Sequence, residues 1–375
     1  MPRAVYLDYN ATAPVRPEAA AAVAEALAEP GNASSVHGFG RRARQRCEAA
    51  RARVARLVGA APVQVVFTGS GSESNNLMLR GTTRLRLLVS AGEHDSVLRA
   101  AEAETIPLRA DGRVDLDALA ALLEGDARPA LVSVMLANNE TGVIQPMEEV
   151  VALARAAGAL VHCDAVQAAG KVPIDFAALG VDAISLSAHK LGGPQGVGAL
   201  VLAEGLEPAP LIRGGGQERR RRAGTENLPG IAGFGAAAEA ALDSLPQARD
   251  LERLRDELER RISALAPELR ILGREAPRLP NTSCFALPGV GAETQVMALD
   301  LAGVAVSAGS ACSSGKVQRS HVLLAMGADE ALAGSAIRVS LGWRSEPRDV
   351  EDFLAAWHAL YSGWCKGGRT ANSAA

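Results

Sequence analysis

Cysteine is scarce in this chain of 375 residues, and the few cysteines present are not arranged in pairs. None of the five stands in a Cys-x-x-Cys motif, and wide intervals separate them. A disulfide framework or a thiolate metal cage requires cysteines at short, regular spacings, so we expect neither, and no metal site is predicted. The cysteines are Cys47, Cys163, Cys284, Cys312 and Cys365.

Net charge, aromatic side chains and long apolar stretches are also lacking. Lys plus Arg number 39 against 42 Asp plus Glu, so a formal charge of −3 gives no general attraction for nucleic acid or an anionic membrane. No stretch reaches the roughly 18 uninterrupted apolar residues of a membrane span, and the first residues show no signal peptide, so we expect a cytoplasmic protein. Basic runs at 41–57 and 218–222 leave RNA binding as a weaker alternative, because an aromatic content of 3% offers few surfaces on which bases could stack.

Short apolar runs are abundant in the central part of the chain. Between residues 63 and 203 they alternate with helix-length segments, and they read VQVVFTG, LRLLVSAG, ALVSVMLA, ALVHCDA, DAISLSA and GALVLAE. This alternation predicts an α/β protein with a mostly parallel sheet covered by helices. Ligands bind beyond the carboxyl ends of such strands, so the residues after each run are candidates for a site.

A smaller α+β domain is predicted after residue 245. There the charged helix pattern ARDLERLRDELERRISALA precedes the strand-like stretches TSCFALPG and SAIRVSLG. We expect a large domain over 15–245, and a small domain that combines 1–14 with 246–375 and carries a mobile loop around Cys312.

The first candidate site follows the run VVFT, where GSGSESNN places Gly71 and Ser72 at the start of a helix. Free backbone N–H groups and a hydroxyl at a helix start suit a phosphate. A serine N-cap with Glu73 in the first turn is the commoner structural alternative.

Acidic and basic groups follow two further runs. Asp164 and Gln167 come after LVHC, while Lys190 follows AISLSA together with Ser187 and His189. A buried aspartate requires a cation or protonated nitrogen, unless it caps a helix. A lysine in a cleft can lose its proton and attack an aldehyde, although a solvent-facing lysine is the commoner case. A phosphate anchor, a partner for a pyridinium nitrogen and a Schiff-base lysine together predict a site for pyridoxal 5′-phosphate.

Three more polar residues have a functional and a structural interpretation each. His94 could stack on a flat ring or transfer a proton, or it could be structural. Asn139 could reach the cofactor or substrate, or form an Asx-turn. Arg338 lies in an apolar run and could bind a substrate carboxylate or form an internal salt bridge.

Cys312 differs from the other cysteines in its surroundings. It lies among glycines and serines in SAGSACSSG, so we expect an exposed, mobile thiol, although an incidental surface cysteine is the alternative. Cys163 and Cys284 lie inside strand patterns and are expected to be inert core residues.

Motifs along nearly the whole chain give it a resemblance to the cysteine desulfurases, a branch of the class V aminotransferase superfamily of pyridoxal phosphate enzymes. The motifs, in family order, are YLDYNATAP, GNASSVH, FTGSGSESNN, NNETGVIQP, HCDAVQAAGK, SLSAHKLGGPQGVG, GGGQERRRRAGTEN, SAGSACSSG and IRVSLG. The resemblance implies a fold-type I homodimer whose sites are completed by the partner subunit. It also implies conversion of L-cysteine to L-alanine with transfer of sulfur to an enzyme cysteine. The spacing after Cys312 is similar to that of the longer-loop type.

The resemblance also implies a role for each candidate residue. Lys190 would be the Schiff-base lysine, Asp164 the pyridinium partner and Gln167 a hydrogen-bond partner of the ring phenolate oxygen. His94 would stack on the ring and assist proton transfer, and Cys312 would accept sulfur as a persulfide. Phosphate ligands would be Gly71, Ser72, Ser187, His189 and, from the other subunit, Thr225, while Asn139 and Arg338 would hold the substrate carboxylate.

Several points stay open at this stage. A selenocysteine lyase or another class V aminotransferase-type enzyme is the alternative, and for an ordinary aminotransferase Cys312 would be dispensable. The sulfur acceptor is expected to be an iron–sulfur scaffold protein or another acceptor protein. The chain departs from the family at Ala33, usually proline, and at Arg220, where glycine is common, and we interpret both as local backbone changes.

Overall fold

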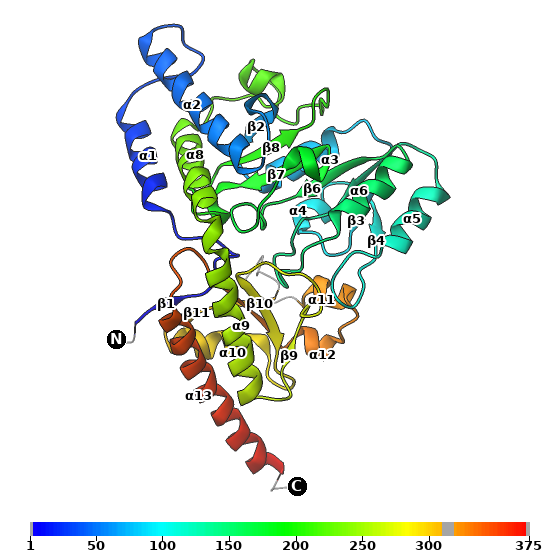
Figure 1. Ribbon diagram of the computed structural model, residues 1–375, viewed down its shortest axis with the longest axis vertical. Helices are drawn as coiled ribbons and strands as arrows, with labels where there is room; N and C mark the ends of the chain where they lie inside the picture. The colour runs from blue at the N-terminus through cyan, green and yellow to red at the C-terminus, as the bar shows by residue number, and fades with distance from the viewer. Residues whose placement is uncertain (1–2, 310–318, 373–375) are drawn as a thin grey trace.

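A seven-stranded sheet forms the centre of the computed structural model, which describes residues 3–309 and 319–372 (Figure 1). Its strand order is β2-β8-β7-β6-β5-β3-β4. Five neighbouring strands, from β7 to β4, run parallel, whereas β8 is antiparallel to both of its neighbours. The predicted mostly parallel sheet is therefore confirmed. The strands are β2 (Val65–Thr68), β3 (Arg86–Ser90), β4 (Glu104–Ile106), β5 (Ala130–Ser133), β6 (Leu160–Asp164), β7 (Ala183–Ser187) and β8 (Gly198–Leu202).

Both faces of this sheet are buried. Within β2, Val65 and Phe67 belong to one hydrophobic cluster and Val66 to another, because successive side chains of a strand point to opposite faces. The covering helices are α1 (Pro17–Ala28), α2 (Gly38–Leu57), α3 (Gly71–Gly81), α4 (Asp95–Leu98), α5 (Leu116–Gly125), α6 (Met147–Ala156), α7 (Phe176–Leu179) and α8 (Leu228–Asp243). Burial on both faces explains why the strands are continuous apolar runs in the sequence.

The C-terminal part of the chain forms a second, antiparallel sheet in the lower part of Figure 1, with strand order β12-β13-β10-β9. Its strands are β9 (Arg270–Ile271), β10 (Thr282–Ala286), β12 (Ser307–Ala308) and β13 (Ala336–Ser340). The predicted helix and the two predicted strands of this region are present as α9 (Ala248–Leu265), β10 and β13. The other helices are α10 (Ala292–Leu301), α11 (His321–Ala325), α12 (Glu330–Ala333) and α13 (Pro347–Asn372).

The N-terminal residues pack with this C-terminal part. Strand β1 (Val5–Tyr6) pairs in parallel with β11 (Val304–Ala305), and Asp8 forms a bridge with Ser340. The domain boundaries at residues 15 and 245 stay a prediction.

Short 3-10 helices connect several elements. They are η1 (Pro62–Gln64), η2 (Ala188–Lys190), η3 (Gln217–Arg220) and η4 (Leu245–Gln247). Because η2 begins directly after β7, it places Lys190 at the carboxyl end of the sheet. In the described residues, no helix combines the length and apolar character that crossing a membrane requires.

Candidate active site

A cavity of about 300 Å³ lies where the parallel strands β6 and β7 end. Its walls come from both sheets and from the N-terminal segment. The predicted site residues that line it are Gly71, Ser72, His94, Asn139, Asp164, Gln167, Ser187, His189, Lys190 and Arg338. The structure therefore brings together side chains that lie far apart in the sequence.

The start of helix α3 forms one wall of the cavity. Ser70 caps the helix, because its Oγ accepts a hydrogen bond from the backbone N–H of Glu73 at 3.1 Å. A Cβ at Gly71 would lie 2.7 Å from Val166 Cγ2, so only glycine fits there. The structural alternative of a serine cap is thus present, and the cap leaves the first backbone N–H groups and Ser72 available to an anion.

Asp164 is buried at the end of β6, with 6% of its surface exposed. One carboxylate oxygen accepts a hydrogen bond from Asn75 Nδ2 at 2.7 Å, and the other accepts one from the N–H of Val166 at 2.9 Å. Both donors are neutral. The carboxylate charge is therefore not cancelled by these contacts, and it faces a cavity that could hold a cationic group.

Lys190 has an unusual environment for a lysine. Its Nζ donates hydrogen bonds to the backbone oxygens of Asn10 at 2.6 Å and Ala11 at 3.0 Å. Burial, together with the positive charge of Arg338, lowers its pKa to about 8, although Asp8 and Asp164 oppose the shift. Lys190 therefore has more unprotonated, nucleophilic amine near neutral pH than a solvent-exposed lysine.

We expect amine labelling of Lys190 to show a midpoint near pH 8 in the ligand-free protein. Because only the unprotonated amine reacts, the labelling rate should rise about tenfold per pH unit below that value and then level off. The chain has only four lysines, so trace acetylation followed by peptide mapping can report on Lys190 separately. A rate that still rises above about pH 10, as for an ordinary lysine, would contradict the effect of burial.

The two histidines of the cavity are held by different contacts. His94 caps α4, since its Nδ1 accepts a hydrogen bond from the N–H of Ser96 at 3.0 Å, so Nε2 carries the proton of the neutral ring. His189 Nδ1 lies 3.2 Å from Thr12 Oγ1. Burial and the nearby charge of Lys190 lower the pKa of His189 to about 4, so His189 is neutral at pH 7.

Arg338 reaches the cavity from β13 and is also part of an internal ion pair. Its guanidinium donates to Asp8 Oδ1 at 2.7 Å and to the backbone oxygen of Asn139 at 2.9 Å. The internal salt bridge considered as the alternative is thus present. However, Arg338 Nε is buried without a partner among the described residues, so within this part of the chain the guanidinium retains a free donor.

Among the predicted site residues that the structure describes, Thr225 does not line this cavity. Thr225 is exposed on the surface of the single chain. Arg220 has a φ of 68°, in the left-handed region that favours glycine. This conformation accords with the family's frequent use of glycine at this position. Cys312 lies outside the described residues.

The buried cysteines match the expectation of inert thiols. Cys163 and Cys284 are fully buried, and Cys47 is nearly so. Burial raises the pKa of Cys284 and of Cys47 to about 12 and that of Cys163 well above its ordinary value. These three thiols are therefore almost entirely protonated at neutral pH.

Some residues of the cavity were not recognised from the sequence. Asn75 holds Asp164, and its Oδ1 is buried with no partner in residues 3–309 and 319–372. Asn10 accepts the hydrogen bond of Lys190 through its backbone oxygen. The signal for Asn75 was its position one helical turn after Gly71, on the same face of α3. Asn10 could be found only through the tertiary fold.

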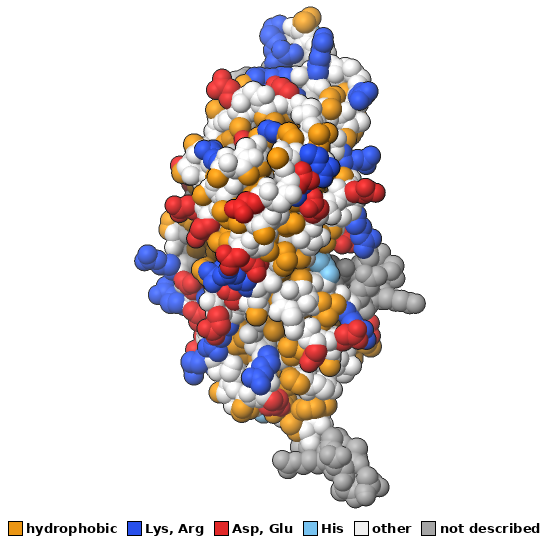
Figure 2. All heavy atoms as spheres, turned by 90° about the vertical axis from the view of Figure 1, so that its right-hand side faces the viewer, with side chains coloured by type: hydrophobic (Ala, Val, Ile, Leu, Met, Phe, Trp, Pro, Cys, Tyr) orange, Lys and Arg blue, Asp and Glu red, His pale blue; other side chains and the backbone are white. Residues whose placement is uncertain are grey.

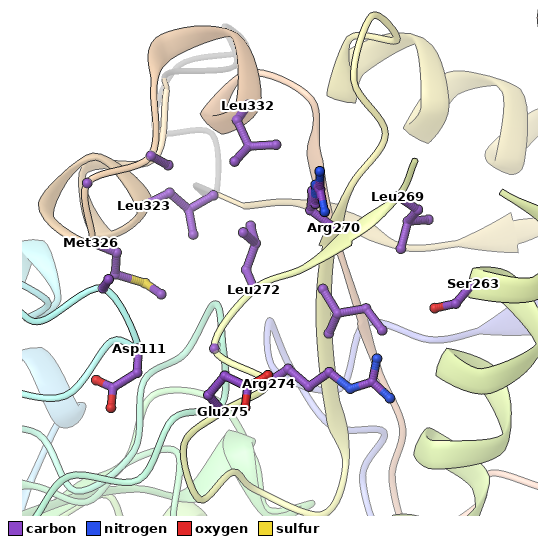
Figure 3. A pocket seen from close by; sticks show the side chains of 15 residues that line it. Asp111, Ser263, Leu269, Arg270, Leu272, Arg274, Glu275, Leu323, Met326 and Leu332 are labelled. Atoms are coloured by element: carbon purple, nitrogen blue, oxygen red, sulfur yellow. The ribbon is translucent and has the colours of Figure 1, made fainter. Parts of the chain in front are cut away.

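A different cavity, of about 450 Å³, lies among α9, β9, α11 and α12 (Figure 3). Leu272, Leu323 and Leu332 lie around its centre, while Asp111 and Glu275 are at one side. None of the predicted site residues that the structure describes lines it. Its mainly aliphatic wall offers no nucleophile beside a base, so the chemistry is assigned to the smaller cavity.

The basic runs that suggested RNA binding are largely neutralised by acidic partners. In the first run Arg51 is buried against Glu218, with an Nη1–Oε2 distance of 2.7 Å. On the face shown in Figure 2, basic side chains gather near the start of α2 and elsewhere mix with acidic ones. The other ion pairs of these runs are Arg42 and Arg46 with Glu29, Arg53 and Arg56 with Glu239, Arg221 with Glu207, and Arg222 with Glu73. Such pairing favours a structural role for the arginines.

Known proteins share this fold and these sequence features. The family described as "Aminotransferase class-V" matches residues 5–353. A solved structure of a NifS-like protein from Rickettsia africae superposes with a TM-score of 0.90 and 34% identity, covering 96% of this chain and 100% of that one. The chain therefore belongs to the class V aminotransferase family.

Curated relatives narrow the activity within the family. A cysteine desulfurase of Cereibacter sphaeroides is 46% identical over 366 residues, which cover 93% of this chain and 94% of the relative. An IscS-like cysteine desulfurase of Mycobacterium tuberculosis is 41% identical over 369 residues, with 93% and 94% covered. The present chain is an enzyme of this type, a cysteine desulfurase.

Proposed function

We propose that the protein binds pyridoxal 5′-phosphate in the cavity of Lys190 and Asp164, converts L-cysteine to L-alanine there, and passes the sulfur to Cys312. The observation that carries the proposal is the meeting of an amine of lowered pKa, a buried carboxylate and a helix start in one cavity of about 300 Å³. These are the three groups that recognise the aldehyde, the ring nitrogen and the phosphate of this cofactor.

The residues present fit the cofactor. A Cβ at Gly71 would crowd Val166 and Ser187, so glycine lets these residues pack closely against the start of α3. Asn75 Oδ1 and Arg338 Nε are buried polar atoms that lack a partner in the part of the chain that the structure describes. A bound molecule with charged and polar groups would satisfy atoms of this kind, since unpaired buried polar groups are otherwise costly.

Each side chain has a task in holding the cofactor. Asp164 would keep a ring nitrogen protonated, and Gln167 would donate to a ring oxygen. The phosphate would be held by the N–H groups at Gly71 and by Ser72, Ser187 and His189. When bound, pyridoxal phosphate supplies a conjugated ring that withdraws electrons from the substrate Cα.

The remaining residues act on the substrate. Arg338 and Asn139 would hold the carboxylate of cysteine, Lys190 would move a proton at Cα, and His94 would stack on the ring and assist proton transfer. The Cys312 thiolate would attack the substrate sulfur. A sulfur–sulfur bond forms as the carbon–sulfur bond breaks, and the electron pair left on carbon takes up a proton to give alanine.

We further propose a cytoplasmic homodimer. Thr225 is exposed in the single chain, so a second copy could contribute it to the phosphate site. The persulfide sulfur would go to an acceptor protein, and an iron–sulfur scaffold protein is the proposed acceptor.

A product assay tests the reaction. The purified protein, loaded with pyridoxal phosphate and given cysteine and a thiol reductant, should release alanine and sulfide in equal amounts. Formation of a keto acid that depends on an added amino acceptor would indicate transamination and would reject the proposal.

A further inference from the structure

A hydrogen-bond network behind the cavity is centred on Asn10, which is 1% exposed. Its backbone oxygen accepts from Lys190 Nζ at 2.6 Å and from Gln167 Nε2 at 2.9 Å. Its side-chain Nδ2 donates to Thr282 Oγ1 at 2.9 Å and to the backbone oxygen of Asn139 at 3.2 Å. One buried residue thus fixes several groups of the site.

Lys171 completes this network from the side away from the cavity. Its Nζ donates to Asn10 Oδ1 and to Gln167 Oε1, both at 2.8 Å. Lys171 lines a neighbouring cavity of about 210 Å³, where Lys190 is also present, and it does not line the cavity of about 300 Å³. Only four lysines occur in the chain, and two of them meet here.

Local structure explains why Lys171 and Gln167 meet. The chain turns after β6 with hydrogen bonds from the N–H of Ala169 to the oxygen of Ala165 and from that of Val172 to Ala168. Gly170 then takes a φ of 75°, in the left-handed region, and this run of turns brings Lys171 back beside Gln167, to which it donates a hydrogen bond at 2.8 Å.

The partners of Gln167 determine which way its amide faces. Asn10 O can only accept hydrogen bonds, so it must face the NH₂ end of the amide, and the N–H groups of Lys171 then face the oxygen end. Burial, with the charges of Lys190 and Arg338, lowers the pKa of Lys171. A neutral amine would still carry two N–H groups, enough for both hydrogen bonds. The second N–H of Gln167 is left for the cavity that Gln167 lines.

We propose that Lys171 is a positioning residue of the reaction, which holds the Gln167 amide so that its N–H, and not its oxygen, faces the bound cofactor. This inference rests on the proposed binding of pyridoxal phosphate. An N–H directed at a ring oxygen favours the anionic form of that oxygen, whereas an inverted amide would disfavour it. Lys171 would therefore influence the ionisation of the cofactor without touching it.

The test is a pH titration of the visible absorption of bound pyridoxal phosphate in the holoenzyme. Replacement of Lys171 with methionine, which keeps an unbranched side chain and removes the donors, should raise the apparent pKa of the bound cofactor by about one unit. In a Gln167→Ala background the same replacement should cause almost no further shift, because the lysine acts through that amide. Lys171→Arg, which keeps N–H donors, should restore most of the parent titration.

The inference is overturned if Gln167→Ala shifts the titration and Lys171→Met leaves it unchanged, or if Lys171→Met shifts it equally in both backgrounds. Should the methionine variant fail to fold, Lys171→Leu, which also removes the donors, should give a shift in the same direction, and the absence of that shift overturns the inference. Failure of the parent protein to bind pyridoxal phosphate would instead reject the proposed function itself.

Discussion

Replacing Lys190 with alanine is expected to lower the rate of alanine and sulfide formation by at least about a thousandfold. Among the described residues, Lys190 carries the only amine that lines the cavity of about 300 Å³, and the change removes with it both the proposed covalent attachment of the cofactor and the group proposed to move the Cα proton. Product formation under saturating pyridoxal phosphate and cysteine measures the effect. The colour of the purified protein gives a second readout, since a protein without this amine should bind the cofactor weakly and lose the absorption of the parent.

Two matched variants separate the role of the amine from that of charge. Lys190→Arg keeps a positive charge but cannot supply a neutral amine, because the guanidinium pKa exceeds about 12, so it should be as inactive as the alanine variant. Lys366→Ala makes the same change in α13, whose C-terminal end points away from the large sheet, and should leave the rate unchanged (Figure 1). Activity of Lys190→Ala within about tenfold of the parent would be incompatible with covalent attachment of the cofactor at this position.

The sequence predicted the sheet because burial on both faces leaves a clear signal. The run AISLS, for example, forms β7, and each of its residues is buried. Strand β4 was missed because it has three residues, two of them exposed, and thus no apolar run. Short strands at a sheet edge depend on a neighbour for their backbone hydrogen bonds, and the local sequence says little about such a neighbour.

The same reasoning explains which parts of the site were predicted. Asp164 and Ser187 end the apolar strands β6 and β7, and Lys190 lies just after β7 in η2, so the positions of the strand ends already placed these residues together. Asn10 and Lys171 act through contacts with residues that are distant in sequence or outside the cavity, and no periodicity reveals such contacts. The pairing of Arg338 with Asp8 is similar, since these residues are 330 positions apart. Tertiary hydrogen bonds of this kind become visible only in the folded chain.

Replacing Cys312 with alanine is expected to abolish sulfur transfer to an acceptor and to lower cysteine-dependent sulfide release by at least about a hundredfold. The buried thiols cannot take its place. A thiol with a pKa of about 12, as for Cys47 and Cys284, is ionised at pH 7 to only about one part in 100,000. Neither has access to the cavity, since both are buried and line none of it.

Cys365 provides the control, because it is the described cysteine that is partly exposed, and it lies in α13. Cys365→Ala should keep the parent rate, and mass spectrometry after a cysteine pulse should find one added sulfur atom on the peptide of Cys312 in this variant. The Cys312→Ala protein should still bind pyridoxal phosphate and still change colour when cysteine is added, because the residues that hold cofactor and substrate are intact. Loss of colour would indicate a damaged site. Undiminished sulfur transfer, or a persulfide on another cysteine of the parent protein, would show that Cys312 is not the residue that takes the sulfur.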